Sequence, residues 1–413
     1  MSPHLILIVI LLIAGVSFLF DQLLDYINLR HQRTDIPDDV AAFYNREQYL
    51  KSLNYHAGLT RFSFLSSSFS FVLSFSMLFF GGFGWLDSFL RMYVHNEISL
   101  ALAFFAIVVF ASDVLTIPFQ WYSTFVIEEK YGFNKTTGRT FVLDKLKGYL
   151  LMAAVGGGLL VTLIYLVRTI GPDFWIWFSV IAAAFVLLVN MFYTSLILPM
   201  FNKLTPLQEG ELKAAIEAFA QKINFPLDNI MVIDGSKRSK KANAFFSGIG
   251  RKKKIVLYDT LIEHHTTREL VAVLAHEVGH YKKKHIVWGY LLSVIQIVFT
   301  LYVLSLLIFN ENVSLALGAH QFGIHLNLLA FGILFSPISG ITSLLMNLYS
   351  RRNEFEADAY ARETYDGNAL SLALKKLSVD SLSSLYPHPL YVFFHYSHPT
   401  LLKRLAALEQ SNR

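Results

Sequence analysis

The chain has 413 residues, of which 54% are hydrophobic and only 16% are charged. Soluble domains usually carry about 25% charged residues, so this composition excludes an ordinary water-soluble protein and indicates that lipid is part of its solvent. The net charge is +5 and there is no cysteine. Disulfides and thiolate metal ligands are therefore excluded, and any metal site must use His, Asp or Glu side chains.

The apolar stretches of the chain predict its architecture. A helix of about 20 residues crosses the ~30 Å hydrocarbon core of a bilayer, and seven stretches are long and apolar enough, or nearly so. We predict membrane spans near 3–24, 62–83, 99–120, 149–167, 175–198, 286–309 and 324–346. The first lacks a basic segment before its apolar run, so it does not resemble a cleavable signal peptide. The predicted fold class is an all-α polytopic membrane protein.

The basic residues lie almost entirely on one side of these predicted spans. Only Arg91 and Arg168 lie on the other side. The remaining 33 Lys and Arg residues lie in 25–61, 121–148, 200–285 and the tail after 346. Because cytoplasmic loops carry the basic excess, we predict a lumenal or periplasmic N-terminus and a cytosolic active site and C-terminus. The absence of cysteine and the short connections on the far side favour a bacterial inner membrane, with the endoplasmic reticulum membrane as the alternative.

The largest polar segment predicts a small folded domain. Helical periodicity runs from about Glu209 to Lys222, two β-rich runs follow at Ile230–Ile233 and Lys254–Tyr258, and a second helix begins near Thr267. We therefore predict a small α+β domain on the cytosolic side. The expected organisation is spans one to five in 1–198, the α+β segment in 199–285, spans six and seven in 286–346 and a cytosolic tail in 347–413.

The second helix of this segment carries the pattern H-E-x-x-H at His276, Glu277 and His280. Residues i and i+4 share one face of a helix, about 5–6 Å apart, so the two imidazoles can bind one tetrahedral zinc ion. The glutamate between them would lie beside the metal as general base. Apolar residues before the motif favour the helix that this arrangement needs, and we predict a catalytic zinc site here.

A catalytic zinc usually takes three protein ligands, and the residues just after the motif do not supply the third. In the extended pattern H-E-x-x-H-x-x-G-x-x-H, Lys283 stands in place of the glycine and Ile286 in place of the third histidine. His285 lies five residues after His280, about 140° around an α-helix, and is expected to be a surface or interfacial histidine. Another helix must therefore contribute the ligand.

The tail stretch Arg351–Asp358 is the candidate. Glu354 can supply a ligand oxygen, and Asp358, one turn later, can accept a hydrogen bond from a ligand histidine and fix its tautomer. In the alternative interpretation both acids pair with Arg351 and Arg352 on a solvated helix face.

Together these motifs resemble those of the type I CAAX prenyl endopeptidases, a family of membrane-embedded zinc metalloproteases. The likeness covers nearly the whole chain and rests on several motifs in the right order. They are Phe125–Asn134, Leu198–Leu207, Asn243–Gly248, His276–His280, Glu354–Asp358 and His395–Pro399.

The resemblance implies seven helices around a large closed chamber, with the metal near its cytosolic end. It implies one zinc ion per chain, bound by His276, His280 and Glu354. Glu277 would take a proton as hydroxide attacks the scissile carbonyl and pass it to the leaving amine.

The same resemblance implies roles for three residues outside the two helices. His398 would stabilise the oxyanion, Asn243 would hold the substrate backbone beside an edge strand, and Arg404 would support the substrate region. The alternatives are that Asn243 is a turn residue, that His398 is an interfacial histidine and that Arg404 is a solvated tail residue.

The function that the resemblance implies is zinc-dependent cleavage of membrane-associated or C-terminally prenylated peptides. Two other functions stay open. A membrane quality-control metalloprotease of broad specificity would usually have a shorter chain with fewer spans, and a non-catalytic transporter or receptor would not need the intact motif. We expect a peptide or lipidated peptide and the bilayer as partners, and no nucleic acid. The sequence gives no indication of oligomeric state.

Overall fold

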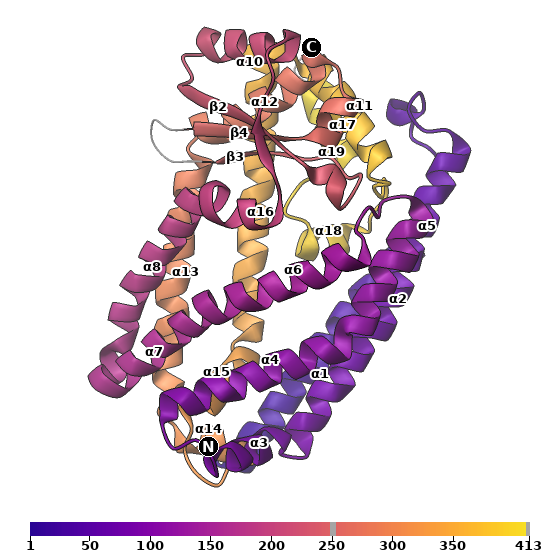
Figure 1. Cartoon of the computed structure of the whole chain (residues 1–413). Coiled ribbons are helices and arrows are strands. Elements are labelled where there is room, and N and C mark those ends of the chain that lie inside the picture. The colour runs from indigo at the N-terminus through magenta and orange to yellow at the C-terminus, as the bar shows by residue number, and fades with distance from the viewer. Residues whose placement is uncertain (248–252, 410–413) are drawn as a thin grey trace.

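The computed structural model describes residues 1–247 and 253–409; Gly248, the last residue of the 243–248 motif, lies outside them. Figure 1 shows long helices that run between two ends of the molecule. One end holds the N-terminus, and the other holds a small sheet, several shorter helices and the C-terminus.

The long helices make up the part that we assign to the membrane. They are α1 (Pro3–Arg30), α2 (Arg46–Phe79), α4 (Glu97–Tyr122), α6 (Gly138–Leu151), α7 (Gly157–Ile170), α8 (Phe174–Phe192), α13 (His285–Leu307), α15 (Ile324–Leu334) and α16 (Ser336–Ala361). Shorter helices join them: α3 (Gly82–Arg91), α5 (Glu129–Tyr131), α9 (Leu198–Phe201) and α14 (Glu311–Ala316). Single π-helical turns continue several helices, at Ser123–Glu128, Met152–Gly156, Tyr193–Ile197 and Arg362–Asp366.

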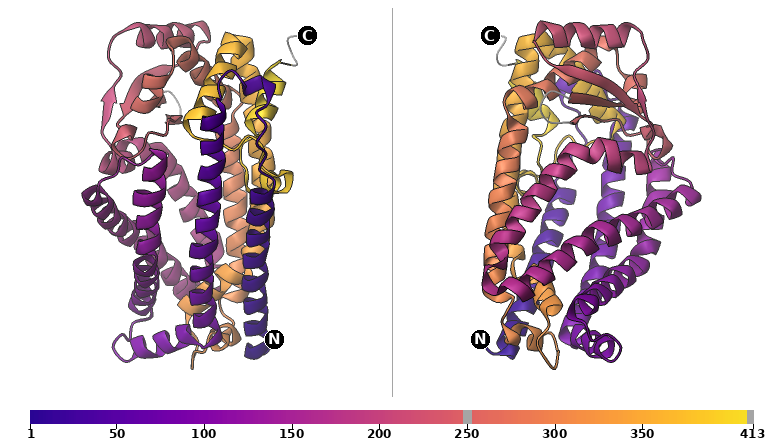
Figure 2. Two further views of the ribbon diagram at one scale, coloured as in Figure 1. Left: turned by 90° about the vertical axis from the view of Figure 1, so that its right-hand side faces the viewer. Right: turned by 60° about the vertical axis from the view of Figure 1, so that its left-hand side comes forward.

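Five helical stretches within the described part of the chain are long and apolar enough to cross a membrane, and a sixth is formed if α15 and α16, bent by 52°, count as one. One of the five, Gly138–Phe201, turns back on itself at Gly171, whose φ of 72° is readily adopted only by glycine. Figure 2 shows α7 and α8 as the two arms of this turn, and Val167 and Phe174 pack in one cluster beside it. A polytopic helical membrane protein is confirmed; the count of seven spans and the closed chamber stay predictions.

The outer faces of these helices are apolar. On α1, the side chains of Leu12, Val16, Leu19 and Leu23 recur every three or four residues and are all more than half exposed. A soluble protein rarely leaves an apolar face of this size uncovered. Lipid is the solvent that such a face requires, in agreement with the composition.

The sheet contains the two predicted strands and two that the sequence did not predict. The strands are β1 (Leu204–Pro206), β2 (Leu227–Ile233), β3 (Ala244–Ser247) and β4 (Lys253–Tyr258), in the spatial order β1-β2-β4-β3. The central pair is parallel, with Ile230 opposite Ile255, and both outer pairs are antiparallel. The missed strands are the two edges. β1 is three residues long and ends in a proline, which an edge strand tolerates.

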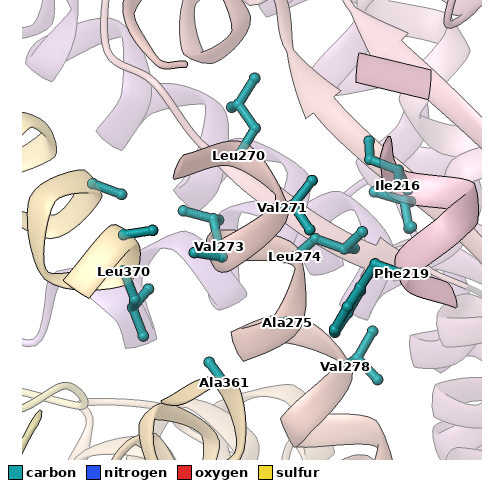
Figure 3. Packing of buried hydrophobic residues seen from close by; sticks show 14 of the residues in the cluster. Ile216, Phe219, Leu270, Val271, Val273, Leu274, Ala275, Val278, Ala361 and Leu370 are labelled. Carbon is teal, nitrogen blue, oxygen red and sulfur yellow. The ribbon is translucent and has the colours of Figure 1, made fainter. Parts of the chain in front are cut away.

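Helices α10 (Glu211–Lys222), α11 (Asp259–His264), α12 (Thr267–Lys282), α17 (Gly367–Asp380), α18 (Pro389–His395) and α19 (Leu401–Glu409) complete the sheet-bearing end. Figure 3 shows α12 at the centre of its apolar core. Val271 and Leu274 of α12 lie in one buried cluster with Phe219 of α10 and with Leu370 of α17. The segments that flank the sixth and seventh predicted spans therefore fold into one body, with α12 in its core.

Candidate active site

The motif helix α12 begins at a strong N-terminal signal. The hydroxyl of Thr266 accepts from the backbone N–H of Glu269 at 3.3 Å, and the Glu269 carboxylate accepts from the N–H of Thr266 at 2.9 Å. This reciprocal capping box satisfies two backbone donors that a helix start leaves unpaired. Burial would raise the pKa of Glu269, but hydrogen bonds from Lys376 and Thr266 lower it. The predicted helix start is thus confirmed.

The third acidic group comes from α16, which packs tightly across α12. At Gly279, the glycine inside the H-E-x-x-H pattern, an added Cβ would lie 3.0 Å from the Cα of Ala357 and 3.1 Å from the Cβ of Tyr360. A glycine lets the two helices approach this closely without displacing the neighbouring atoms. The approach brings Glu354, one turn before Ala357 on α16, to the two histidines of α12.

Three ligand atoms converge at this crossing. The Nε2 atoms of His276 and His280 are 3.2 Å apart. Of the two carboxylate oxygens of Glu354, Oε2 lies 3.5 Å from the first nitrogen and Oε1 lies 3.3 Å from the second. A tetrahedral zinc ion with bonds of about 2.0–2.1 Å holds its ligand atoms about 3.3 Å apart. The three residues therefore fit such an ion. Among the described residues, they are the cluster of His and acidic side chains that could hold a metal.

Asp358 lies behind His276. Its Oδ1 is 2.8 Å from His276 Nδ1, so the ring donates from Nδ1 and leaves the Nε2 lone pair free for a metal. Burial would lower the pKa of His276, but hydrogen bonds with Asp358 and Glu354 raise it to about 9. A proton thus competes with a metal for this ligand, because only the neutral imidazole can bind.

Arg404 is buried beside these acids and is not a solvated tail residue. Its guanidinium donates to both oxygens of Asp358, at 2.8 and 2.6 Å, and lies 3.4 Å from Glu354. The interpretation of a solvated acidic face on α16 is wrong: Glu354 and Asp358 are 4% and 1% exposed. Arg352 pairs instead with Glu356 at 3.0 Å.

The expectation for His285 is also wrong. This residue is buried, its Nδ1 lies 3.0 Å from Nδ1 of His280, and its Nε2 lies 3.2 Å from Glu356. The angle of about 140° assumed one continuous helix, but α12 ends at Lys282 and Lys284 adopts a left-handed conformation with φ of 60°. No turn residue marks this break in the sequence, so spacing could not have revealed it.

Glu277 lines a cavity of about 300 Å³ together with His276, His280 and Glu354. Burial raises the pKa of Glu277, and positive charge on the two histidines opposes the rise. A carboxylate with a raised pKa is a stronger base than an ordinary one. This placement is what the prediction of a general base requires.

The remaining predicted residues line the same cavity. His398 is 64% exposed, its Nε2 lies 3.4 Å from Glu354, and its Nδ1 lies 2.9 Å from the hydroxyl of Ser397. Asn243 is exposed just before edge strand β3; its side chain accepts from the N–H of Ala244, and its carbonyl accepts from Tyr258. The structure thus brings every predicted site residue to one place, while the roles of His398, Asn243 and Arg404 stay predictions.

Among the residues that the structure describes, Arg351 does not pair with the acids of α16 and instead contacts the segment around α18. Its guanidinium donates to the carbonyls of Val392, at 3.2 Å, and of Tyr396, at the end of α18. Asn347, one turn earlier, donates to the carbonyl of Phe394 at 2.9 Å. These bonds fix the segment that leads to His398. Backbone acceptors leave no signature in a sequence, so this contact could not have been predicted.

A polytopic helical body joined to a small α+β domain, with H-E-x-x-H and a glutamate from a crossing helix, defines a membrane-embedded metallopeptidase. Comparison with known proteins agrees. Residues 25–203 match the family model for the CAAX prenyl protease N-terminal region with five membrane helices, and residues 206–412 match peptidase family M48. The chain belongs to peptidase family M48 and is a metalloendopeptidase.

The chain is similar over most of its length to several known proteins. It is 33% identical to CAAX prenyl protease 1 homolog of Oryza sativa, over 94% of each chain. It is 36% identical to CAAX prenyl protease 1 of Saccharomyces cerevisiae, over 77% of this chain and 74% of that protein. The crystal structure of S. mikatae Ste24p superposes with a TM-score of 0.93 at 32% identity, covering 98% of this chain and 99% of that one. Membership of a peptidase family favours the protease over the transporter or receptor.

Proposed function

We propose that this protein is a zinc-dependent endopeptidase that cleaves membrane-associated or C-terminally prenylated, CAAX-type peptides. The observation that carries the proposal is the convergence of His276, His280 and Glu354 within 3.2–3.5 Å of one another, with Glu277 beside them in one cavity. Two imidazoles and a carboxylate are the donor set of many catalytic zinc sites.

The residues of the site divide the chemistry among them. A zinc ion held by the three ligands would supply Lewis acidity, which polarises a carbonyl and lowers the pKa of water. Glu277 takes a proton from the attacking water and returns it to the leaving amine nitrogen. His398, at the exposed side of the cavity, donates to the carbonyl oxygen as negative charge develops there. Asp358 keeps His276 in the tautomer that binds metal, and Arg404 holds Asp358 in place.

The shape of the site supports a peptide substrate bound as an extended strand. β3 is an edge of the sheet in the described part of the chain, and an extended peptide can bind by adding a strand to such an edge. Asn243, at the start of β3, lies where it can hold the added backbone. Beyond Glu277 the cavity is lined by apolar side chains, which suit the aliphatic residues of a CAAX sequence. They are Leu261, Val273, Leu370, Leu374 and Leu377.

We further propose that the metal-bearing end faces the cytosol. The 33 basic residues on that side of the predicted spans, against two on the other, support this orientation. Relatives from yeast, rice and human favour the endoplasmic reticulum membrane over a bacterial inner membrane.

The test is cleavage of a farnesylated and an unprenylated C-terminal peptide by the purified, detergent-solubilised protein. We expect the prenylated peptide to be cleaved, and cleavage to be lost on chelation and in Glu277→Gln with zinc still bound. Glu263→Gln, an exposed glutamate on α11, is the matched control and should leave activity unchanged. Equal cleavage of both peptides would replace the substrate proposal with a broad quality-control peptidase. If the wild-type protein bound no zinc, the proposed function would be wrong.

A further inference from the structure

The junction between α12 and α13 places a histidine that the proposed reaction does not use. Lys284 occupies the left-handed region at φ 60°, a costly conformation for a residue with a side chain. The break turns His285 toward α12, where its Nδ1 comes within 3.0 Å of Nδ1 of His280. A strained backbone conformation is found where surrounding contacts stabilise it, often at functional sites. Here the contact is made to His280, one of the three predicted metal ligands.

The direction of each hydrogen bond follows from the chemistry of its ends. His280 turns Nε2 toward the other two ligand atoms, 3.2 Å from His276 and 3.3 Å from Glu354. The neutral ring that binds a metal through Nε2 carries its hydrogen on Nδ1, so Nδ1 donates to Nδ1 of His285. His285 then carries its hydrogen on Nε2 and donates to Glu356 at 3.2 Å. No second arrangement satisfies both ends.

The two ligand histidines are thus supported in different ways. His276 donates directly to a buried carboxylate, Asp358. On the side away from the metal, Nδ1 of His280 is linked to a carboxylate through the ring of His285. That carboxylate, Glu356, is partly exposed and anchored by Arg352 at 3.0 Å. The carboxylate behind a ligand histidine orients the ring and makes it a better donor. The His285 imidazole, placed between Glu356 and His280, transmits both the orienting effect and the increase in donor strength.

We propose that His285 is a positioning residue for the metal ligand His280, and that Glu356 completes a hydrogen-bonded chain from the protein surface to the metal. This inference rests on the proposed zinc site. It concerns how firmly the ion is held, so it can be tested without substrate.

The experiment measures zinc affinity of the full-length protein in detergent by competition with a chromophoric chelator. In His285→Phe we expect zinc binding to weaken by about 10- to 100-fold, the usual cost of losing such a partner. His285→Asn keeps an oxygen acceptor near the position of Nδ1, and we expect it to restore most of that loss. Glu356→Ala should weaken binding in the same direction by a smaller factor. His264→Phe, on α11 and half exposed, is the matched control and should bind zinc like the wild type.

The unfolding temperature of each metal-free variant separates positioning from folding. The proposal predicts unchanged unfolding for the partly exposed Glu356→Ala together with weaker zinc binding. Wild-type zinc affinity in both Glu356→Ala and His285→Asn, with early unfolding of metal-free His285→Phe, would show a purely structural histidine and overturn the proposal. Wild-type affinity in His285→Phe would overturn it as well. Failure of the wild type itself to bind zinc would instead remove the proposed function.

Discussion

Two clusters of buried charged side chains lie at opposite ends of this molecule, and they are built differently. At the end that holds the N-terminus, Asp87 of α3 is 1% exposed and meets Arg91 at 3.0 Å and His325 at 2.9 Å. Arg91 also contacts Glu97 at 2.8 Å. Each carboxylate there faces a nitrogen, of the Arg91 guanidinium or of the His325 ring. At the sheet-bearing end, three groups with lone pairs face one another instead.

This difference distinguishes a cluster that stabilises the fold from a cluster that can bind a metal. A closed set of ion pairs needs nothing else and serves to hold α3, α4 and α15 together. A set of converging acceptors is unfavourable unless a cation or protons join it, because like groups repel at short range. The burial of His276, Glu354 and Asp358 with Arg404 behind them is therefore the mark of a site, while burial of charge alone is not.

The largest expected effect comes from Glu354→Ala. The variant loses one of three ligands, so we expect no stoichiometric zinc and peptide cleavage at background, with the protein still folded. Zinc content by mass spectrometry and cleavage of the farnesylated peptide check both points. Glu363→Ala, further along the same helical stretch and 66% exposed, should change neither. Full zinc occupancy in Glu354→Ala would disprove the ligand assignment.

Asp87→Ala should show the opposite pattern. It leaves the buried His325 without its partner and leaves Arg91 with Glu97 alone. We expect this to cost about 3–5 kcal/mol in the free energy of unfolding, while zinc binding stays intact. Thermal unfolding in detergent measures the loss. The control is Glu209→Ala, which removes an exposed partner of Lys213 and should have no measurable effect. Loss of zinc in correctly folded Asp87→Ala would contradict the separation of the two clusters.

Gly279→Ala tests the helix crossing that assembles the site. The added methyl group must push against the backbone of Ala357, and we expect a loss of about 1–3 kcal/mol in stability together with at least tenfold weaker zinc binding, since Glu354 moves with α16. Gly289→Ala on α13, where a Cβ meets nothing within 4 Å, is the control and should not destabilise. Equal behaviour of the two variants would show that the close approach is unimportant.

The smallest expected effect concerns pH and Glu269. The pKa of this carboxyl is lowered in the folded protein, so its contribution is present at neutral pH and is lost as pH falls through the folded-state pKa. Glu269→Gln keeps the capping geometry but not the charge that faces Lys376. We expect it to cost about 1 kcal/mol at pH 7 and nothing in acid. The difference in unfolding temperature between the wild type and Glu269→Gln should shrink as the pH is lowered from 7 to 3. A difference that stays constant over this range would contradict this account.

The sequence by itself determined the features that repeat along the chain. The apolar runs predicted a polytopic helical membrane protein. The helix start near Thr267 and the spacing of His276 and His280 predicted the motif helix, and i, i+4 spacing put Glu354 and Asp358 on one face. Each of these follows from the periodicity of an α-helix or from the thickness of a bilayer. Such rules act between residues that are near in sequence, so they can be applied without a structure.

Only the tertiary structure decided which distant groups meet. Edge strands β1 and β3 are too short to carry a period-2 signal, and they form because the central pair offers unpaired backbone groups. Arg404 reaches Asp358 across 46 positions of the chain, and His285 reaches His280 only because the helix breaks at Lys284. The positions of these groups depend on how helices cross and where the backbone turns, and that is set by packing of the whole core, which no local pattern records.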